Sequence, residues 1–204
     1  MAVSLSDLNE YIAAVAATIK TTTNVVAWSL GGLMAIRLAL AAPSLINKIV
    51  FIASAAKFVN QGTAINPAWF KKFQSDFKNR PAATLKKFLA LQTKDDEYSQ
   101  SALRQLRNIL PVEQYDFNEC DLGLAMLANL DLNSELKRLP CSAGFIHGEC
   151  DAVLPIQAGR AAAAECGAKF YSIPAAGHAV HVSHPQLVAE IILNYLDVER
   201  DEQY

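Results

Sequence analysis

Long apolar runs are absent from this chain, and none approaches the roughly 20 residues that a helix needs to cross a bilayer. Residues 1–10 lack the basic start and apolar core of a secretory signal peptide. Cysteine is scarce, and its four positions, Cys120, Cys141, Cys150 and Cys166, show no Cys-x-x-Cys spacing. Scattered thiols fit a reducing cytoplasm better than a disulfide framework. We therefore expect a cytoplasmic protein with no membrane partner.

Internal repeats and low-complexity linkers are also absent, so the 204 residues suit one domain with a sizeable core. Apolar residues make up 52% of the chain and charged residues 19%, which excludes a disordered protein. No nucleic-acid recognition motif is present and the isoelectric point is about 6.1, so nucleic acid is not an expected partner.

Positive charge is concentrated between Lys57 and Leu110, although the whole chain carries a net charge of −2. Such asymmetry indicates a basic surface suited to an acidic partner, while ordinary solvated helix faces would give the same count. Four acidic residues lie in this stretch, against ten basic ones: Lys57, Lys71, Lys72, Lys78, Arg80, Lys86, Lys87, Lys94, Arg104 and Arg107.

Ser29 lies where an apolar strand-like run, Val25–Trp28, turns abruptly into a helix-like stretch. A serine on a sharp strand-to-helix turn projects its hydroxyl above the sheet, where a base can reach it. Such a turn needs small residues two positions before and after the serine, because the strand and helix backbones nearly touch. Gly31 is one of these residues, and Ala27 stands where glycine is usual. Ser29 is therefore our candidate nucleophile.

A serine nucleophile needs a histidine base and a carboxylate that orients the histidine. In enzymes with this turn the chain order is Ser, then Asp or Glu, then His, each after a strand. Asp151 follows the apolar run 142–146 and precedes Pro155, which could open a helix. His178 follows the strand candidate 168–173. Each residue alone could be structural, but their order and placement favour a Ser29–Asp151–His178 site.

Other titratable residues near these positions are weaker candidates. His178, His181 and His184 recur every third residue, which could suggest metal ligands. They lie in a loop, however, and no cysteine or carboxylate pair completes a ligand set, so we expect neither a metal nor another cofactor. Glu149 could substitute for Asp151, although a solvated loop residue is the simpler interpretation.

Strand and helix candidates alternate at both ends of the chain, which is typical of βαβ units and a parallel sheet. A helical pattern interrupts this alternation from Asn66 to about Asn129. We predict a core formed by residues 1–56 and 134–204, with residues 57–133 inserted as a helical lid over the site. Helices are expected over 6–19, 33–42 and 186–196, and strands over 24–28, 48–53, 142–146 and 168–173.

Three segments carry a family resemblance: Trp28–Gly32 at the turn, Lys87–Thr93 in the predicted lid, and Gly177–Ala179 with Ser183–Pro185 around the candidate base His178. The turn alone would indicate an α/β-hydrolase. With the lid heptapeptide, the chain resembles the pimeloyl-acyl-carrier-protein methyl ester carboxylesterases of biotin synthesis, from about Ser4 to Leu196. The implied fold is the α/β-hydrolase fold, with a mostly parallel sheet and a helical lid insertion.

The resemblance implies cleavage of a methyl ester at the far end of a pimeloyl chain on acyl carrier protein. It assigns Ser29 as nucleophile, Asp151 as orienting acid, His178 as base and the Leu30 N–H as one oxyanion donor. The substrate-binding residues that it implies are Trp28, Phe88, Leu89, Ala90, Leu91 and Gln92, with Phe88 as the main wall of the acyl channel.

The resemblance also implies that the acidic carrier protein docks on basic lid residues. Ala83 and Gln100 stand where arginines are expected, which weakens this docking. The candidate docking residues that remain basic are Lys86, Lys87, Arg104 and Arg107.

The chain departs from the family before Ser6, where relatives have several more strands and a His-Gly loop that donates the second oxyanion N–H. We expect an N-terminally truncated fold, from a misplaced start codon or as a shortened variant that associates. The strand before Ser29 would then be an exposed edge. His147-Gly148 follows the wrong strand to replace that loop.

Two other functions remain open on sequence alone. One is a general small-ester carboxylesterase of the same fold with an inherited lid. The other is a catalytically weak binding module that keeps the three residues but lacks half of the oxyanion hole.

Overall fold

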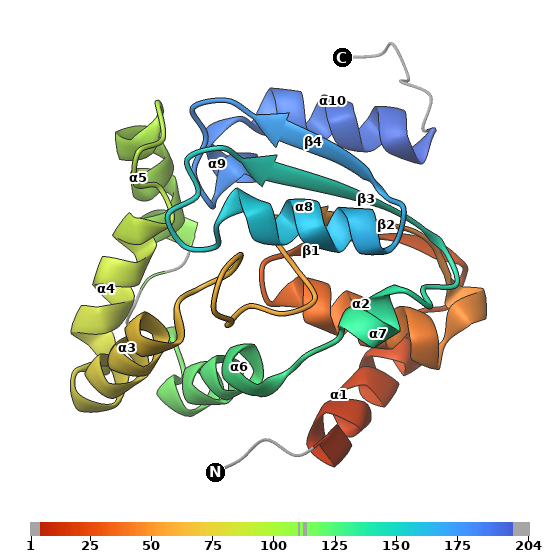
Figure 1. Cartoon of the computed structure of the whole chain (residues 1–204), viewed down its shortest axis with the longest axis horizontal. Helices are drawn as coiled ribbons and strands as arrows, with labels where there is room; N and C mark the ends of the chain where they lie inside the picture. The colour runs from red at the N-terminus through yellow and green to blue at the C-terminus, as the bar shows by residue number, and fades with distance from the viewer. Residues whose placement is uncertain (1–4, 110, 112–113, 198–204) are drawn as a thin grey trace.

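A parallel sheet lies at the centre of the computed structural model, which describes residues 5–109, 111 and 114–197 (Figure 1). Its strands are β1 (Thr23–Trp28), β2 (Ile46–Ile52), β3 (Ser142–Gly148) and β4 (Lys169–Ile173). They lie side by side in the order β1-β2-β3-β4, and every neighbouring pair is parallel. The predicted mostly parallel sheet is therefore confirmed.

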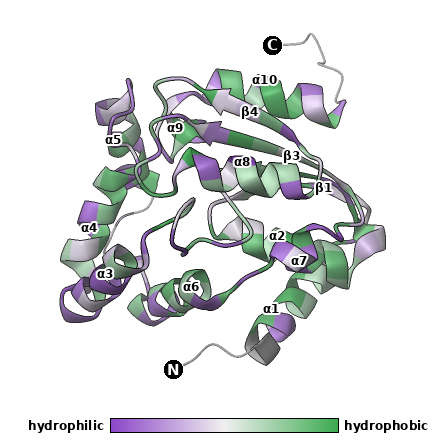
Figure 2. Cartoon of the chain, in the orientation of Figure 1, coloured by the Kyte–Doolittle hydropathy of each residue, from purple (hydrophilic) through white to green (hydrophobic). Residues whose placement is uncertain are grey.

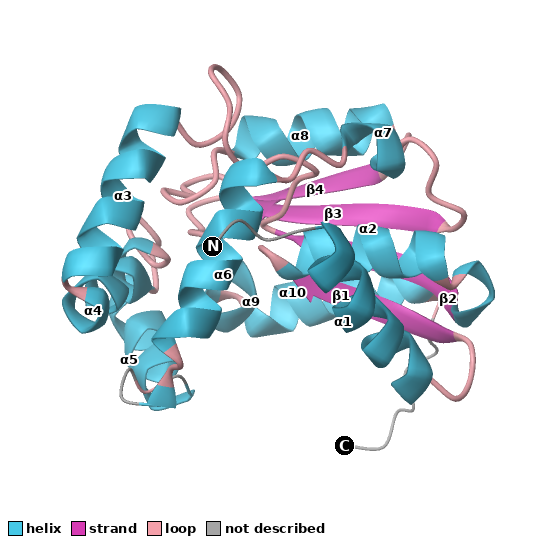
Figure 3. Ribbon diagram, turned by 90° about the horizontal axis from the view of Figure 1, so that it is seen from below, coloured by secondary structure: helices cyan, strands magenta, loops and turns pink. Residues whose placement is uncertain are grey.

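Helices cover both faces of this sheet. On one face lie α1 (Leu5–Thr18), α2 (Gly31–Ala41) and α8 (Ile156–Glu165), and on the other α9 (Val180–Ser183) and α10 (Pro185–Leu196). Figure 3 shows α1 and α2 in front of the sheet and α10 behind it. A short 3-10 helix, Pro43–Leu45, leads into β2. Parallel strands that are covered on both faces are largely apolar. In β2, Val50 and Ile52 face α10, whereas Ile49 and Phe51 face α2.

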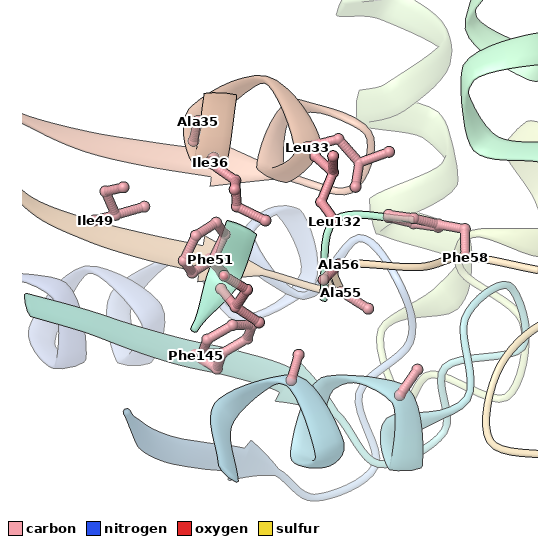
Figure 4. Close-up of a cluster of buried hydrophobic side chains, with 14 of the residues drawn as sticks. Leu33, Ala35, Ile36, Ile49, Phe51, Ala55, Ala56, Phe58, Leu132 and Phe145 are labelled. Atoms are coloured by element: carbon pink, nitrogen blue, oxygen red, sulfur yellow. The ribbon is translucent and has the colours of Figure 1, made fainter. Parts of the chain in front are cut away.

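Phe51 and Phe145 anchor the larger of the two cores. Their rings stack with centroids 4.6 Å apart, and each side chain is 1% exposed. Figure 4 shows Leu33 and Ile36 of α2 in the same cluster. Truncating a buried phenylalanine costs about 3–5 kcal/mol, so this cluster holds α2 firmly on the sheet. The turn that carries Ser29 lies directly before that helix.

Between β2 and β3 the chain forms a set of helices beyond the carboxyl ends of the strands, on the side toward which the arrows point in Figure 1. Asn66 caps the first of these helices by accepting hydrogen bonds from the Ala68 and Trp69 N–H groups, and Asp116 caps a later one in the same way. The set consists of α3 (Pro67–Asn79), α4 (Pro81–Leu91), α5 (Ser99–Ile109) and α6 (Phe117–Asn129). A last short helix, α7 (Asn133–Leu136), lies beside α2 and α8 before the chain enters β3.

The helices differ in the hydropathy of their residues. Figure 2 shows α2 as mainly hydrophobic and α3 as more hydrophilic, in keeping with their central and peripheral positions. Across the part of the chain that the structure describes, no helix combines the length and the apolar character needed to cross a membrane.

β1 forms one edge of the sheet within the described residues, as the sequence predicted for this strand. Val26 in its middle is 48% exposed, whereas Ala27 is buried against the larger core. An uncovered edge of a parallel sheet presents unpaired backbone groups to solvent.

Gly148, the last residue of β3, generates a stability prediction. A Cβ at this position would lie 2.3 Å from the carbonyl oxygens of Ala176 and Gly177, which belong to backbone and cannot rotate away. Gly148→Ala should therefore lower the free energy of unfolding by about 1–3 kcal/mol, the usual cost of overpacking. Gly31→Ala is the matched control, because nothing lies within 4 Å of its Cβ. Equal losses of stability in both variants, measured by urea unfolding, would contradict this account.

Candidate active site

Ser29 adopts a left-handed backbone conformation, with φ of 52°, at the junction between β1 and α2. A non-glycine residue with positive φ is strained and is held there by its surroundings. Its N–H donates to the Ile52 carbonyl at 2.9 Å, which extends the pairing of β1 with β2. Its carbonyl accepts hydrogen bonds from the Gly32 N–H at 2.9 Å and the Ser54 hydroxyl at 2.8 Å. These bonds fix the sharp turn that exposes the serine hydroxyl.

The closest backbone approach at this turn differs from the sequence prediction. We assigned it to Gly31, but a Cβ on Gly31 would meet nothing within 4 Å. A Cβ on Gly32 would lie 2.0 Å from the Ser54 Oγ. The tight position is therefore three residues after the serine, because Ser54 packs under the first turn of α2.

Ser29, His178 and Asp151 lie in one continuous chain of hydrogen bonds. The Ser29 Oγ lies 3.0 Å from the His178 Nε2, and the His178 Nδ1 lies 2.8 Å from the Asp151 Oδ2. The three residues follow β1, β4 and β3 respectively, so the carboxyl ends of three parallel strands bring them together. Asp151 and His178 are both buried. Such an arrangement can deprotonate a serine hydroxyl.

The Asp151 carboxylate is held by donors on both oxygens. Its Oδ1 accepts the N–H groups of Val153 and Leu154 at 2.8 Å each, and its Oδ2 lies 3.0 Å from the His147 Nε2 as well as close to His178. Burial by itself would raise the pKa of the Asp151 carboxyl. The charge of His178 and the hydrogen bonds from both histidines outweigh it and hold that pKa well below its ordinary value.

His147 is a residue of this site that the sequence analysis did not assign to it. Its Nε2 faces two acceptors, the Asp151 Oδ2 and the Leu154 carbonyl, both at 3.0 Å, so this nitrogen carries the proton. A Cβ on Gly159 would lie 2.4 Å from its Nδ1, so α8 packs directly on the ring. The sequence signal that could have placed His147 in the site is its position four residues before Asp151. Glu149, the alternative acid, is exposed.

The other two loop histidines have different partners. The His181 ring lies edge-on to Trp28 with centroids 4.6 Å apart, and burial together with the charge of His178 lowers the pKa of His181 to about 4. The His184 Nε2 lies 3.0 Å from the Glu97 Oε1. Among the described residues, no group of three His, Cys, Asp or Glu side chains is placed to hold a metal.

A largely apolar cavity of about 560 Å³ opens over Ser29 and His178. The sequence-predicted residues in its wall are Trp28, Phe88, Leu89 and Gln92, together with Leu30. The Leu30 N–H makes no hydrogen bond within the described part of the chain, so it is available as a donor. Residues that the sequence did not assign to the cavity include Phe73, Phe77, Leu85, Tyr115, Glu119, Cys120, Leu124 and Leu127, from α3, α4, α6 and the segment before α6.

Ala90 and Leu91 do not line this cavity, contrary to the expectation for a continuous Phe88–Gln92 wall. Only one side of α4 faces the cavity, and residues at i, i+3, i+4 and i+7, here Leu85, Phe88, Leu89 and Gln92, share that side. Leu91 instead lines a neighbouring groove of about 650 Å³ between α3 and α4, and Ala90 lines neither.

The candidate docking residues Lys86, Lys87, Arg104 and Arg107 are all exposed, two on α4 and two on α5. Lys87 lines the α3–α4 groove together with Lys72 and Arg80. The structure therefore places basic side chains on the exposed surface of α4, which lines the cavity, and of α5, which follows it.

Comparisons with known proteins agree with this fold. The model of the alpha/beta hydrolase family matches residues 2–191. Among solved structures, the esterase EaEST from Exiguobacterium antarcticum has a TM-score of 0.80 at 18% identity and a bromoperoxidase from Bacillus anthracis 0.78 at 19%. Each match covers 94% of this chain and 72% of the other. At these identities the similarity shows the fold alone.

Curated relatives are closer in sequence. The biotin biosynthesis bifunctional protein BioHC of Teredinibacter turnerae is 34% identical over 203 residues, which cover 93% of this chain and 36% of that protein. The pimeloyl-[acyl-carrier protein] methyl ester esterases of Aeromonas salmonicida and Aeromonas hydrophila are 33% and 31% identical, over 81% and 89% of this chain.

The chain spans about a third of the bifunctional relative, and 66% and 73% of the two Aeromonas esterases. The resemblance identified from the turn, lid and base segments is confirmed by these relatives. The chain belongs to the alpha/beta hydrolase family and, within it, is a relative of the pimeloyl-[acyl-carrier protein] methyl ester esterases.

Proposed function

We propose that this chain is a serine carboxylesterase that hydrolyses the methyl ester of a pimeloyl chain carried on acyl carrier protein, a step in biotin synthesis. The observation that carries the proposal is the hydrogen-bonded series Ser29–His178–Asp151 at the floor of an apolar cavity. The names of the relatives support the substrate.

In the proposed reaction the His178 Nε2 accepts the proton of the Ser29 hydroxyl as the Oγ attacks the ester carbonyl carbon. The tetrahedral oxyanion is stabilised by the Leu30 N–H. Its collapse breaks the bond to the methoxy oxygen, which takes the proton from His178 and leaves as methanol. Water, deprotonated by His178, then attacks the acyl-enzyme, and the Ser29 oxygen leaves with that proton to release the free carboxylate.

Asp151 holds His178 in the tautomer that presents a bare Nε2 to the serine and stabilises the imidazolium that forms. The other nucleophile candidate in the cavity wall is Cys120. Burial, together with the nearby Asp116 and Glu119, raises the pKa of the Cys120 thiol, so it stays protonated and unreactive at neutral pH. Ser29 is therefore the nucleophile that the geometry favours.

The cavity suits an acyl chain because its walls are mostly apolar and aromatic. The rings of Phe73 and Phe88 lie 5.5 Å apart in one wall. Gln92 is buried in the same wall, and its Oε1 has no hydrogen-bond partner within the described residues. We propose that residues 57–133 act as a lid that excludes water, over a core of residues 1–56 and 134–204.

Replacing the nucleophile should abolish hydrolysis while leaving the fold intact. Ser29→Ala should lower kcat for a p-nitrophenyl ester by about 10³-fold or more, because loss of a member of such a triad removes most of the chemical acceleration. It should also stop labelling by a fluorophosphonate. Ser183→Ala is the control, because Ser183 bonds to His184 rather than to His178. Turnover of Ser29→Ala within tenfold of wild type would rule out Ser29 as the nucleophile.

Hydrolysis should require a neutral base, so kcat/KM should rise as the pH increases across the near-neutral range. Asp151 is ionised throughout this range because its pKa is lowered, and His181 is neutral because its pKa is lowered to about 4. One ascending limb is therefore expected.

Two variants separate the histidines in that pH profile. His178→Gln should remove the limb together with activity. His181→Phe keeps a ring against Trp28 and should leave the midpoint unchanged. If the second variant moved the midpoint while the first retained activity, the base would be His181.

Binding of the carrier-linked substrate should depend on the basic surface of the lid. Lys87→Glu combined with Arg104→Glu should raise KM for a carrier-linked pimeloyl methyl ester by about tenfold at low salt, with a smaller effect at high salt. A free methyl ester should be hydrolysed as before. Lys20→Glu, which reverses the same charge at an exposed residue just after the end of α1, is the control and should leave this KM unchanged. Hydrolysis of p-nitrophenyl esters by the wild type, without hydrolysis of the carrier-linked ester, would support the general small-ester carboxylesterase instead.

A further inference from the structure

The residues on either side of His178, Gly177 and Ala179, both donate their backbone N–H groups to one segment of the helical insertion. The Gly177 N–H donates to the Asp96 Oδ2 at 2.7 Å, and the Ala179 N–H donates to the Gln92 carbonyl at 3.0 Å. We call residues 92–98, between α4 and α5, the strap, and residues 175–179 the base loop. The strap lies about 80 residues before the base loop in the sequence.

The strap is itself tightly constrained. The second oxygen of Asp96, Oδ1, accepts the Tyr98 N–H at 2.7 Å, and the Glu97 N–H donates to the Ala175 carbonyl at 2.9 Å. Asp95 and Ala175 both have positive φ, at 59° and 53°, so each segment holds a strained residue where the two meet. Asp96 itself is only 7% exposed.

The opposite side of the base loop rests on the loop after β3. The Cys150 N–H donates to the Ala176 carbonyl at 2.8 Å, and Gly148 packs against the carbonyls of Ala176 and Gly177. The base loop is thus held between a support on the sheet and a support on the insertion. The support on the insertion is the one that bonds on both sides of His178.

We propose that Asp96 is a positioning residue for the reaction proposed above, on which this inference rests. Its carboxylate fixes the backbone N–H of Gly177, the residue before His178, and so sets the imidazole between Ser29 and Asp151. A misplacement of about 1 Å at a reacting group can cost about 10²-fold in rate. The insertion is then part of the catalytic geometry as well as a cover for the cavity.

The chemistry of the carboxylate explains why aspartate suits this position. Two oxygens each accept one backbone N–H, from Gly177 and Tyr98. An asparagine has one acceptor oxygen, so its NH₂ group would face one of these N–H groups and leave that buried donor without a partner.

The test compares Asp96→Asn with Asp95→Asn. The control variant removes the same charge at the neighbouring position, where the side chain is exposed and asparagine tolerates the positive φ. With a p-nitrophenyl ester, Asp96→Asn should lower kcat at least tenfold and change KM less than twofold. The rate of fluorophosphonate labelling at Ser29 should fall in parallel. Asp95→Asn should stay within twofold of wild type in all three measurements. Rates are normalised to the fraction of protein that labels at completion, which excludes unfolded molecules.

A second variant covers the case in which Asp96→Asn does not fold. A Cβ on Gly177 would lie 2.9 Å from the Gln92 carbonyl oxygen, so Gly177→Ala should push the base loop from the strap and lower kcat in the same way. Unchanged kcat in whichever of these variants folds, or an equal loss in Asp95→Asn, would overturn the role of Asp96. A wild type that neither hydrolyses esters nor reacts with the fluorophosphonate would overturn the proposed function, and this inference with it.

Discussion

The hydrogen bond between the His178 Nδ1 and the buried Asp151 carboxylate is the interaction on which the rest of the site depends. It sets the tautomer and the direction of the imidazole, and only then can the other nitrogen meet the Ser29 hydroxyl. A buried carboxylate is costly unless its lone pairs are satisfied. Two backbone N–H groups and the His147 ring satisfy them, so the carboxylate of Asp151 is stable in its ionised form beside His178.

That hydrogen bond requires three loops to approach closely, and small residues make the approach possible. Gly32 leaves room for Ser54 under the turn at Ser29, and Gly148 leaves room for the base loop over the end of β3. Gly159 allows α8 to pack on His147. The parallel sheet supplies the common edge, because the carboxyl ends of β1, β3 and β4 lie on one side. Close packing of these backbones transmits the rigidity of the sheet to the side chains above it.

The helical insertion contributes to the site in two ways. Its inner surface forms most of the cavity wall, with aromatic residues of α3 and α4 opposite residues of α6. Its strap bonds to the base loop on both sides of His178.

Local patterns in the sequence were sufficient to predict the alternating strands and helices, the parallel sheet and the proximity of Ser29, Asp151 and His178. Each of these depends on hydrophobic periodicity and on the residues at one strand end. The tertiary structure decided the close approach at Gly32, the displacement of Ala90 and Leu91 from the cavity, and the contacts of His147 and Asp96. The physical reason is that these features depend on how helices rotate and loops meet across the fold. A contact such as that of Asp96 with Gly177 joins segments whose separation along the chain leaves no local periodic signal.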